Sequence, residues 1–141
     1  MNRRFAIFLG TLLCGVVPVA VHAQSGKQAS SGVYTAEQAT RGAALYQSKC
    51  AECHGPDLAG GGTSPALVGS DFSTSWSGKP VATLFNAIHT SMPSDRPGSL
   101  TLQQTADVVA FLLKVNSYPA GKTELPTDAD RLKSILIDSI Q

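Results

Sequence analysis

The chain has 141 residues, 43% of them hydrophobic, and its 11 basic and 10 acidic residues leave a net charge of +1. No basic patch is present in the sequence, which argues against a nucleic acid as a partner. Large apolar residues are sparse for a domain of this size, so side chains alone provide little material for a core.

Residues 1–23 have the form of a secretory signal peptide. A positive start over 2–4 precedes an almost wholly apolar run over 5–21, and residues 21–23 end with the small side chains that a signal peptidase reads. The alternative is a retained membrane anchor, for which an apolar run of 17 residues containing glycines and a proline is at the short limit. We therefore predict export, with cleavage after Ala23.

Cys14 raises the further alternative of a lipoprotein, but the bulky Leu13 before it disfavours lipid attachment there. Cleavage after Ala23 leaves 118 residues, the size of a single domain, with a net charge of −1. Residues 24–34 are rich in Gly, Ser and Gln, which indicates a flexible N-terminal segment before the first helix.

The first predicted helix spans 36–49, where good helix formers follow one another without a proline. Thr35 and Gln38 have the spacing of a capping box at its start. Gly42 lies on the apolar face, although an isolated glycine in a helix costs about 1 kcal/mol relative to alanine. We expect a second helix to cross closely at Gly42; the alternative is a glycine that the helix merely tolerates.

Cys50 and Cys53, with His54 directly after them, form a Cys-x-x-Cys-His motif. Two thiols at i and i+3 lie on one face of a single helical turn, where both can form thioether bonds to one porphyrin. The imidazole that follows is then held beneath the iron. The pattern is typical of c-type haem attachment and occurs once, so we predict one covalent haem. A haem within the core also explains the sparse large apolar residues.

The cysteine pair has other interpretations. A structural zinc site needs four ligands, and outside the motif the chain adds only Cys14, His22 and His89. A thioredoxin-like pair belongs in a βαβ setting, whereas the flanks here predict a helix and a Gly-rich loop. A disulfide between the two cysteines would close a small loop and leave the histidine without a role.

A loop is predicted after His54, because Gly55 and Pro56 end the helix and three consecutive glycines follow at 60–62. Such a loop can wrap a flat prosthetic group without regular structure. Trp76 follows in a Ser-rich stretch, and its indole N–H needs an acceptor when it is buried. Trp76 is therefore either a core residue or a hydrogen-bond donor to a haem propionate.

Two further helices are predicted downstream. Residues 81–88 place apolar side chains at i, i+3, i+4 and i+7, in a helix that begins near Pro80 and ends before Met92. Residues 102–115 form the longest helical run, which begins with a second capping box at Thr101 and Gln104. Both helices have one apolar stripe and can pack against a shared core.

Met92 is the one methionine after the leader, and it lies 38 residues beyond His54 in a non-helical segment fixed by Pro93. A thioether on a rigid segment suits the second axial ligand of a haem iron. One alternative is a methionine that fills a gap in the core. The other is coordination by His89, one turn earlier, which is otherwise a solvated or capping side chain at a helix end.

Asn116 closes the last long helix, and the residues that follow are interrupted by prolines and a glycine, so the region after 118 is predicted to be extended. The final stretch over 131–140 is ambiguous. Its apolar side chains fit a short helix, whereas three consecutive large apolar residues at 135–137 fit a strand equally well.

These features resemble a class I c-type cytochrome across nearly all of residues 24–141. Gly42 and Tyr46 stand eight and four residues before Cys50, where that family places the small and aromatic residues of its first helix. Residues 107–112 resemble the last helix of the family, which crosses the first at those positions.

The resemblance also implies roles for two loops. Residues 65–67 resemble the segment whose proline carbonyl accepts the N–H of the haem-ligating histidine, which would pair Pro65 with His54. Met92 and Pro93 match the axial methionine segment. A closer likeness over 64–92 and 116–126 is to the cytochrome domains of quinohaemoprotein alcohol dehydrogenases and to small cytochromes associated with quinoprotein (PQQ) dehydrogenases.

We therefore expect an all-α, class I cytochrome c fold, with three main helices and loops around one haem. The cytochrome domain spans 35–118, and 119–141 is a C-terminal extension. The residues expected at the haem are Cys50, Cys53, His54, Pro65, Trp76 and Met92, with His54 and Met92 on the iron.

The expected function is one-electron transfer in the periplasm rather than catalysis. The donor is a redox protein such as a quinoprotein dehydrogenase, and the acceptor is an oxidase or another cytochrome. One alternative is a subunit held permanently in a dehydrogenase complex. The other is a haem enzyme or gas sensor with an open axial site, against which Met92 argues.

Overall fold

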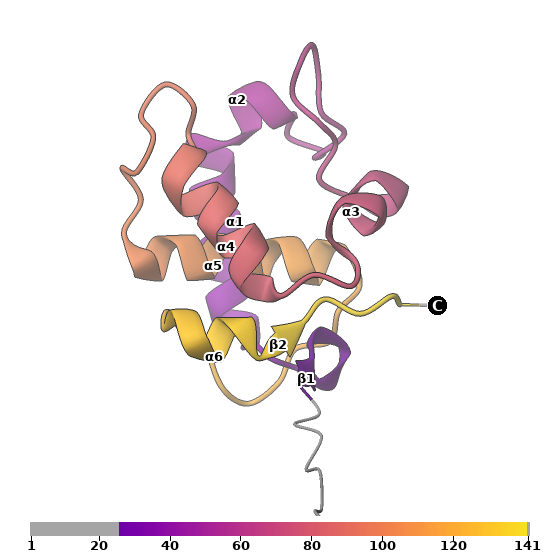
Figure 1. Ribbon diagram of the computed structural model, residues 1–141. Helices are drawn as coiled ribbons and strands as arrows, with labels where there is room; N and C mark the ends of the chain where they lie inside the picture. The colour runs from indigo at the N-terminus through magenta and orange to yellow at the C-terminus, as the bar shows by residue number, and fades with distance from the viewer. Residues whose placement is uncertain (1–25, 141) are drawn as a thin grey trace, which may run out of the picture.

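The computed structural model describes residues 26–140, so the predicted signal peptide over 1–23 lies outside the described residues. The described chain is predominantly helical, as predicted (Figure 1). Its elements are β1 (Lys27–Gln28), the 3-10 turn η1 (Ala29–Ser31), α1 (Ala36–Lys49), α2 (Ala51–His54), α3 (Gly69–Trp76), α4 (Val81–Ser91), α5 (Leu102–Val115), α6 (Ala129–Lys133) and β2 (Ile135–Leu136). Within residues 26–140, none of the helices has the length and apolar character needed to cross a bilayer.

The three main helices occupy the predicted residues, because their ends are encoded locally. Thr101 and Gln104 form a complete capping box at the start of α5, and Asn116 caps its end. At the start of α1 the Thr35 side chain accepts from the Gln38 N–H, but Gln38 does not reciprocate. Its buried amide instead pairs with both backbone groups of Leu125, at 2.7 and 3.2 Å. The predicted first capping box is therefore only half formed.

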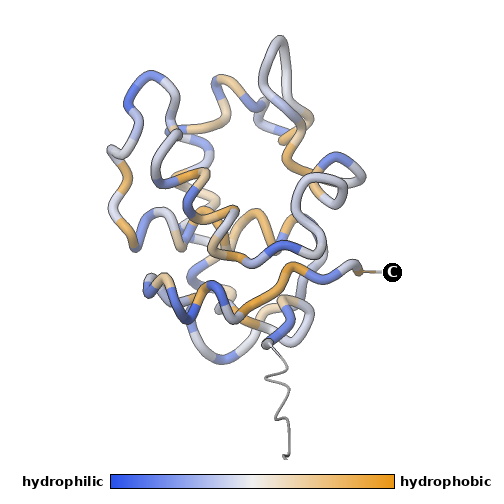
Figure 2. Tube along the Cα trace, in the orientation of Figure 1, coloured by the Kyte–Doolittle hydropathy of each residue, from blue (hydrophilic) through white to orange (hydrophobic). Residues whose placement is uncertain are grey.

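Helices α1 and α5 cross in direct contact at Gly42. A Cβ atom at this position would lie 1.8 Å from the backbone oxygen of Asp107 and 2.9 Å from Cβ of Phe111. The expected close crossing is confirmed, and a tolerated glycine is ruled out. Helix α4 packs against α5 and also against α6 and β2, and the hydrophobic stretches of the chain gather where these elements meet (Figure 2).

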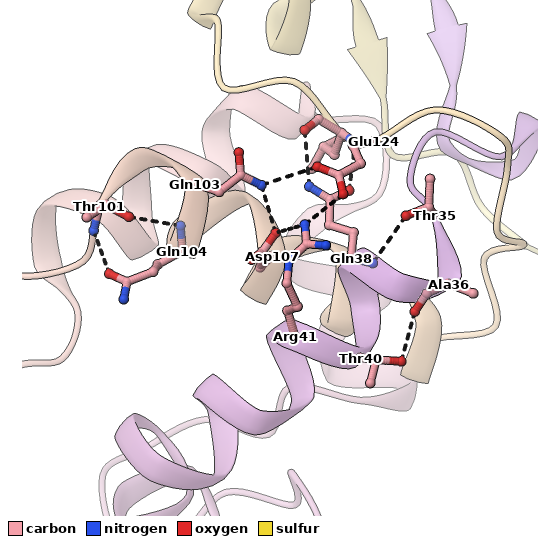
Figure 3. A network of polar contacts seen from close by, with 11 residues as sticks. Thr35, Ala36, Gln38, Thr40, Arg41, Thr101, Gln103, Gln104, Asp107 and Glu124 are labelled. Atoms are coloured by element: carbon pink, nitrogen blue, oxygen red, sulfur yellow. Dashed lines mark hydrogen bonds and ion pairs between the residues drawn. The ribbon is translucent and has the colours of Figure 1, made fainter.

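A polar network borders the same crossing (Figure 3). Arg41 of α1 donates from Nε and Nη2 to the two carboxylate oxygens of Asp107, at 3.0 and 2.9 Å. It also donates to Glu124 at 2.8 Å, and Gln103 donates to Asp107 at 2.9 Å. These hydrogen bonds, first with Asp107 and then with Glu124, raise the pKa of Arg41. The network joins α1, α5 and the C-terminal segment.

The start of the described chain is ordered, and here the prediction of a flexible segment over 24–34 is wrong for residues 26–34. Strand β1 pairs in parallel with β2, with Lys27 opposite Ile135 and Gln28 opposite Leu136. The side chains at 29, 33 and 34 are buried. The reason is a partner more than one hundred residues away, which the local composition does not reveal.

The ambiguous stretch over 131–140 contains both predicted structures in succession. Helix α6 ends at Lys133, and β2 begins at Ile135. Beyond β2, the Ile137 N–H donates to the Lys79 carbonyl at 2.9 Å and its carbonyl accepts from the Gly78 N–H at 2.7 Å. The C-terminal extension is thus fastened to the segment between α3 and α4.

Helix α3 lies in the Ser-rich stretch, for which the sequence predicts no helix. Residues 69–76 contain three serines and a threonine, which favour caps and turns because their side chains compete for backbone hydrogen bonds. In the structure Ser73 bonds the Gly69 carbonyl one turn back at 3.1 Å, and Phe72 is buried. Burial of one aromatic residue thus accompanies a helix that propensity alone does not favour.

Replacement of Gly42 by alanine tests the helix crossing. On helix propensity alone, Gly42→Ala would stabilise the protein by about 1 kcal/mol. Because the added methyl group meets backbone rather than a movable side chain, we expect destabilisation by about 3 kcal/mol instead. Urea denaturation of the holoprotein measures the difference, with Ala44→Ser on the exposed face of α1 as the control. A more stable Gly42→Ala protein would contradict the close crossing.

A second prediction about stability concerns the polar network around Arg41. The side chain of Asp107 is only 6% exposed, whereas that of Glu124 is 45% exposed and solvent can replace its partner. We expect Asp107→Asn to lower the free energy of unfolding several-fold more than Glu124→Gln does. Thermal denaturation of the two isosteric variants provides the measurement, and equal losses would show that the buried carboxylate has no special role.

Candidate functional site

The Cys-x-x-Cys-His motif forms the single turn that follows α1. Cys50 caps α1 through its N–H bond to the Tyr46 carbonyl at 2.8 Å, and the His54 N–H returns to the Cys50 carbonyl at 3.0 Å. Both thiols are free, with Cys50 half-buried and Cys53 exposed. Burial, followed by the neighbouring Cys53, raises the pKa of the Cys50 thiol. The turn presents two unpaired thiols three residues apart, as thioether formation requires.

His54 is oriented by the loop that follows it. Its Nδ1 lies 3.0 Å from the carbonyl oxygen of Pro65. Because a carbonyl only accepts, Nδ1 carries the proton in this contact, and Nε2 keeps its lone pair for a metal. Gly60 makes the loop compact: its N–H donates to the His54 carbonyl at 2.8 Å, and at φ +77° a Cβ atom would lie 2.6 Å from the Ser64 oxygen.

The side chains of Tyr46 and Asn116 connect the motif turn and the loop after it to the helices. The buried Tyr46 hydroxyl donates to the Gly55 carbonyl at 2.6 Å, and its ring lies 5.3 Å from that of Phe111. Burial, followed by the charges of Cys50 and Asp57, raises the pKa of Tyr46 to about 12. The hydroxyl therefore stays protonated and remains a donor at neutral pH.

Asn116 makes the second connection, which the sequence analysis missed. Its amide nitrogen donates to the Leu67 carbonyl at 2.9 Å, and its amide oxygen accepts from the Gly69 N–H at 3.0 Å. The loop that contains Pro65 is thereby fixed to the end of α5. The sequence marks Asn116 only as a helix cap, because its second role depends on a loop 47 residues earlier.

Met92 caps the end of α4, where its N–H donates to the Ile88 carbonyl at 3.0 Å. Its side chain is partly buried against the core. For the alternative ligand His89, Nδ1 lies 3.3 Å from the hydroxyl oxygen of Thr105 on α5, and the ring lies 6.0 Å from that of Phe85. The structure thus places the His89 side chain beside α5 and the Met92 side chain against the core.

Trp76 ends α3 and is partly buried against the core. The ammonium group of Lys79 lies 5.6 Å from the centre of its ring. Trp76 therefore combines an apolar surface that faces the core with a nearby positive charge, which suits a residue at the edge of an anionic prosthetic group.

The surroundings of the motif fit a haem. A group of apolar side chains packs against the core yet stays partly exposed. It comes from α1, α2, α3, α5 and the segments between the helices: Leu45, Cys50, Ala51, Leu67, Val68, Trp76, Met92, Phe111 and Val115. Figure 1 shows α2, the loop after it, α3 and α4 arranged as a ring. Within residues 26–140, no group of three or more His, Cys, Asp or Glu side chains is placed to hold a metal ion.

A family model described as cytochrome C oxidase, cbb3-type, subunit III matches residues 37–112, from the first turn of α1 into α5. This segment contains the attachment motif, the loop that orients His54, and Met92. The chain belongs to this cytochrome c family.

A solved structure is similar to this cytochrome c in fold. It is the crystal structure of the sulfane dehydrogenase SoxCD from Paracoccus pantotrophus, with 22% sequence identity and a TM-score of 0.53. The match covers 77% of this chain and 62% of the other, so this chain spans less than two thirds of that protein chain. No curated protein matches.

The family establishes the cofactor and the general role. This cytochrome c carries covalent haem c and is an electron carrier with the helical class I fold. The free thiols of the motif turn and the oriented imidazole of His54 agree with that cofactor.

Removal of both attachment cysteines tests the covalent bond. Wild-type protein matured in a host able to attach haem should gain the mass of one haem and keep its colour in acidified acetone. The Cys50→Ala/Cys53→Ala double variant should lose all covalent haem, because no thiol of the motif remains to form a thioether. Mass spectrometry of the denatured proteins checks both outcomes, with Cys50→Ala alone as the single-thioether control. Covalent haem in the double variant would contradict the assignment.

Proposed function

We propose that this cytochrome c is a periplasmic, monohaem carrier of single electrons, with thioethers at Cys50 and Cys53 and with His54 and Met92 on the iron. The observation that carries the proposal is the 3.0 Å contact between His54 Nδ1 and the Pro65 carbonyl. This contact fixes the tautomer and the ring orientation of a metal-binding histidine, and it makes the other nitrogen a better ligand.

Met92 supports the proposal through its position. A thioether is a soft, weakly bound ligand that the chain must hold in place, and Met92 is fixed by its own backbone bond at the end of α4. The Nδ1 of His89 lies 3.3 Å from the Thr105 hydroxyl, which fixes the His89 ring beside α5. Ligation by Met and His raises the reduction potential of the haem.

The protein chain holds the proposed haem site rigid, which suits electron transfer. Haem iron supplies one-electron chemistry by alternating between the ferric and ferrous states. The side chains of Tyr46, His54 and Asn116 tie α1, the motif turn, the following loop and α5 together. A site held from several elements keeps both ligands in both states, which limits structural change on transfer. We also propose that the Trp76 indole donates to a haem propionate.

The predicted signal peptide over 1–23 supports export to the periplasm. There the protein would accept electrons from a dehydrogenase, such as a quinoprotein dehydrogenase, and pass them to an oxidase or another cytochrome. Short-lived redox complexes of this kind bury less than ~1,200 Å². The second candidate function is a permanent subunit of a dehydrogenase complex, which the likeness to a chain of the sulfane dehydrogenase SoxCD favours.

Replacement of the proposed axial methionine tests the ligand set. Met92→Ala should abolish the weak long-wavelength charge-transfer band of the oxidised protein and lower the reduction potential, because the thioether ligand is lost. A spectroelectrochemical titration measures both the charge-transfer band and the reduction potential. His89→Gln is the matched control and should keep the band and the potential. Retention of the band in Met92→Ala would show that another side chain binds the iron.

The binding of carbon monoxide distinguishes an electron carrier from a haem enzyme or gas sensor. Reduced wild-type protein should bind carbon monoxide slowly and weakly, because Met92 occupies the sixth position, whereas reduced Met92→Ala should bind it rapidly. Flash photolysis and titration provide the rates and affinities. Rapid, tight binding by the wild-type protein would favour an open site and contradict the carrier assignment.

Purification from the native periplasm in both redox states separates the two candidate functions. A free carrier should elute at the size of a single chain, with any dehydrogenase present in substoichiometric amounts. A dehydrogenase that remains at fixed stoichiometry through size exclusion would establish the permanent subunit instead.

A further inference from the structure

The Asn116 side chain, at the end of α5, uses its amide mainly on a distant loop. Its Nδ2 donates to the carbonyls of Leu67 and Leu112, both at 2.9 Å, and its Oδ1 accepts from the Gly69 N–H at 3.0 Å. Because carbonyl oxygens only accept and the N–H only donates, these partners fix the orientation of the amide. Two of the three hydrogen bonds thus hold the loop that carries the Pro65 carbonyl.

The backbone closes the end of α5 by itself, so helix capping does not account for this side chain. The N–H groups of Ser117 and Tyr118 donate at 3.0 Å to the carbonyls three and five residues before them. These two bonds, with Ser117 at φ +69°, form a Schellman motif, which satisfies the last carbonyls of a helix without a side chain. The Asn116 amide is therefore available to the loop.

Residues 58–68 form the loop that carries the Pro65 carbonyl. Within the described chain, the bond from Asn116 to Leu67 is the one hydrogen bond that joins this loop to any residue outside 50–76. The side chain of Leu67 is only partly buried, and Pro65 is exposed, so packing does little to fix this part of the loop. The position of the Pro65 carbonyl therefore depends on Asn116.

The Pro65 carbonyl in turn controls how strong a ligand His54 is. It lies 3.0 Å from Nδ1 of His54, within the usual range of an N–H···O hydrogen bond. A hydrogen bond at one ring nitrogen raises the basicity of the other, the nitrogen that binds a metal. A more basic ligand donates more electron density to iron, which favours the ferric state. Withdrawal of the carbonyl consequently raises the reduction potential.

We propose that Asn116 is a positioning residue for the haem: its amide holds the Pro65 carbonyl against His54 and thereby lowers the reduction potential. This inference rests on the proposed function, because it requires His54 to bind the iron. Asn116 acts without touching the prosthetic group, through one hydrogen bond to the loop and a second from the loop to the imidazole.

Two substitutions of Asn116 test this role. Asn116→Ala removes all three hydrogen bonds, whereas Asn116→Asp loses the donor to the Leu67 carbonyl and keeps an acceptor for the Gly69 N–H. The second variant gives an answer even if the first does not accumulate. Tyr34→Phe is the matched control, because it removes a buried hydrogen bond to the Tyr118 carbonyl, two residues after Asn116, and leaves the loop untouched. All variants are studied as pigmented holoprotein.

NMR spectroscopy of the reduced proteins provides the decisive measurement, because the Nδ1 proton of His54 reports its own hydrogen bond. We expect this proton to shift in both Asn116 variants and to exchange with water roughly tenfold faster, as for the loss of about one hydrogen bond. Tyr34→Phe should keep the wild-type resonance and exchange rate.

The reduction potential provides the second measurement. In Asn116→Ala it should rise, so that the ratio of ferric to ferrous protein at a fixed electrode potential falls several-fold. Tyr34→Phe should keep the wild-type potential. For Asn116→Asp only the His54 proton is compared, because the added negative charge acts on the potential by itself.

An unchanged Nδ1 proton in both Asn116 variants, or an unchanged potential in Asn116→Ala, would overturn this inference even if the variants lost stability. Equal changes in Tyr34→Phe would also overturn it, because general loosening at the end of α5 would then suffice. The proposed function would survive these results if the variants kept covalent haem and the charge-transfer band of Met92 ligation. Wild-type protein without covalent haem, or without that band, would instead overturn the proposed function.

Discussion

The contact between α1 and α5 at Gly42 is the constraint on which the rest of the molecule depends. The two backbones approach so closely that a single methyl group does not fit between them. Helix α1 runs on from this crossing to Lys49, and the attachment turn follows directly. The position of the haem motif relative to the core is therefore decided by a residue eight positions earlier that has no side chain.

From this crossing, a series of hydrogen bonds extends to His54, the proposed iron ligand. Tyr46 packs on Phe111 of α5 and bonds the turn after the motif, and Asn116 bonds the loop from the far end of the same helix. That loop in turn supplies the carbonyl for His54. The chain thus positions a reactive nitrogen through neutral hydrogen bonds, which depend little on ionic strength, rather than through ion pairs.

Local sequence predicted the main helices well, because their caps and apolar stripes lie within the helices themselves. It failed where the stabilising partner is remote. The Gln38 amide pairs with the backbone of a residue 87 positions away instead of completing the capping box. The N-terminal strand likewise pairs with the distant β2. Within the site, the motif and the Pro65 contact could be anticipated, but the role of Asn116 could not. Asn116 acts through a loop that only the folded chain brings near.

The parallel pairing of β1 with β2 brings the two ends of the described chain together, away from α2 (Figure 1). A linker, an affinity tag or a second domain joined at either end would consequently leave the attachment turn uncovered. An architecture of this kind is modular: the same unit can be tethered to an electrode or fused to an enzyme without covering the turn that contains Cys50 and Cys53.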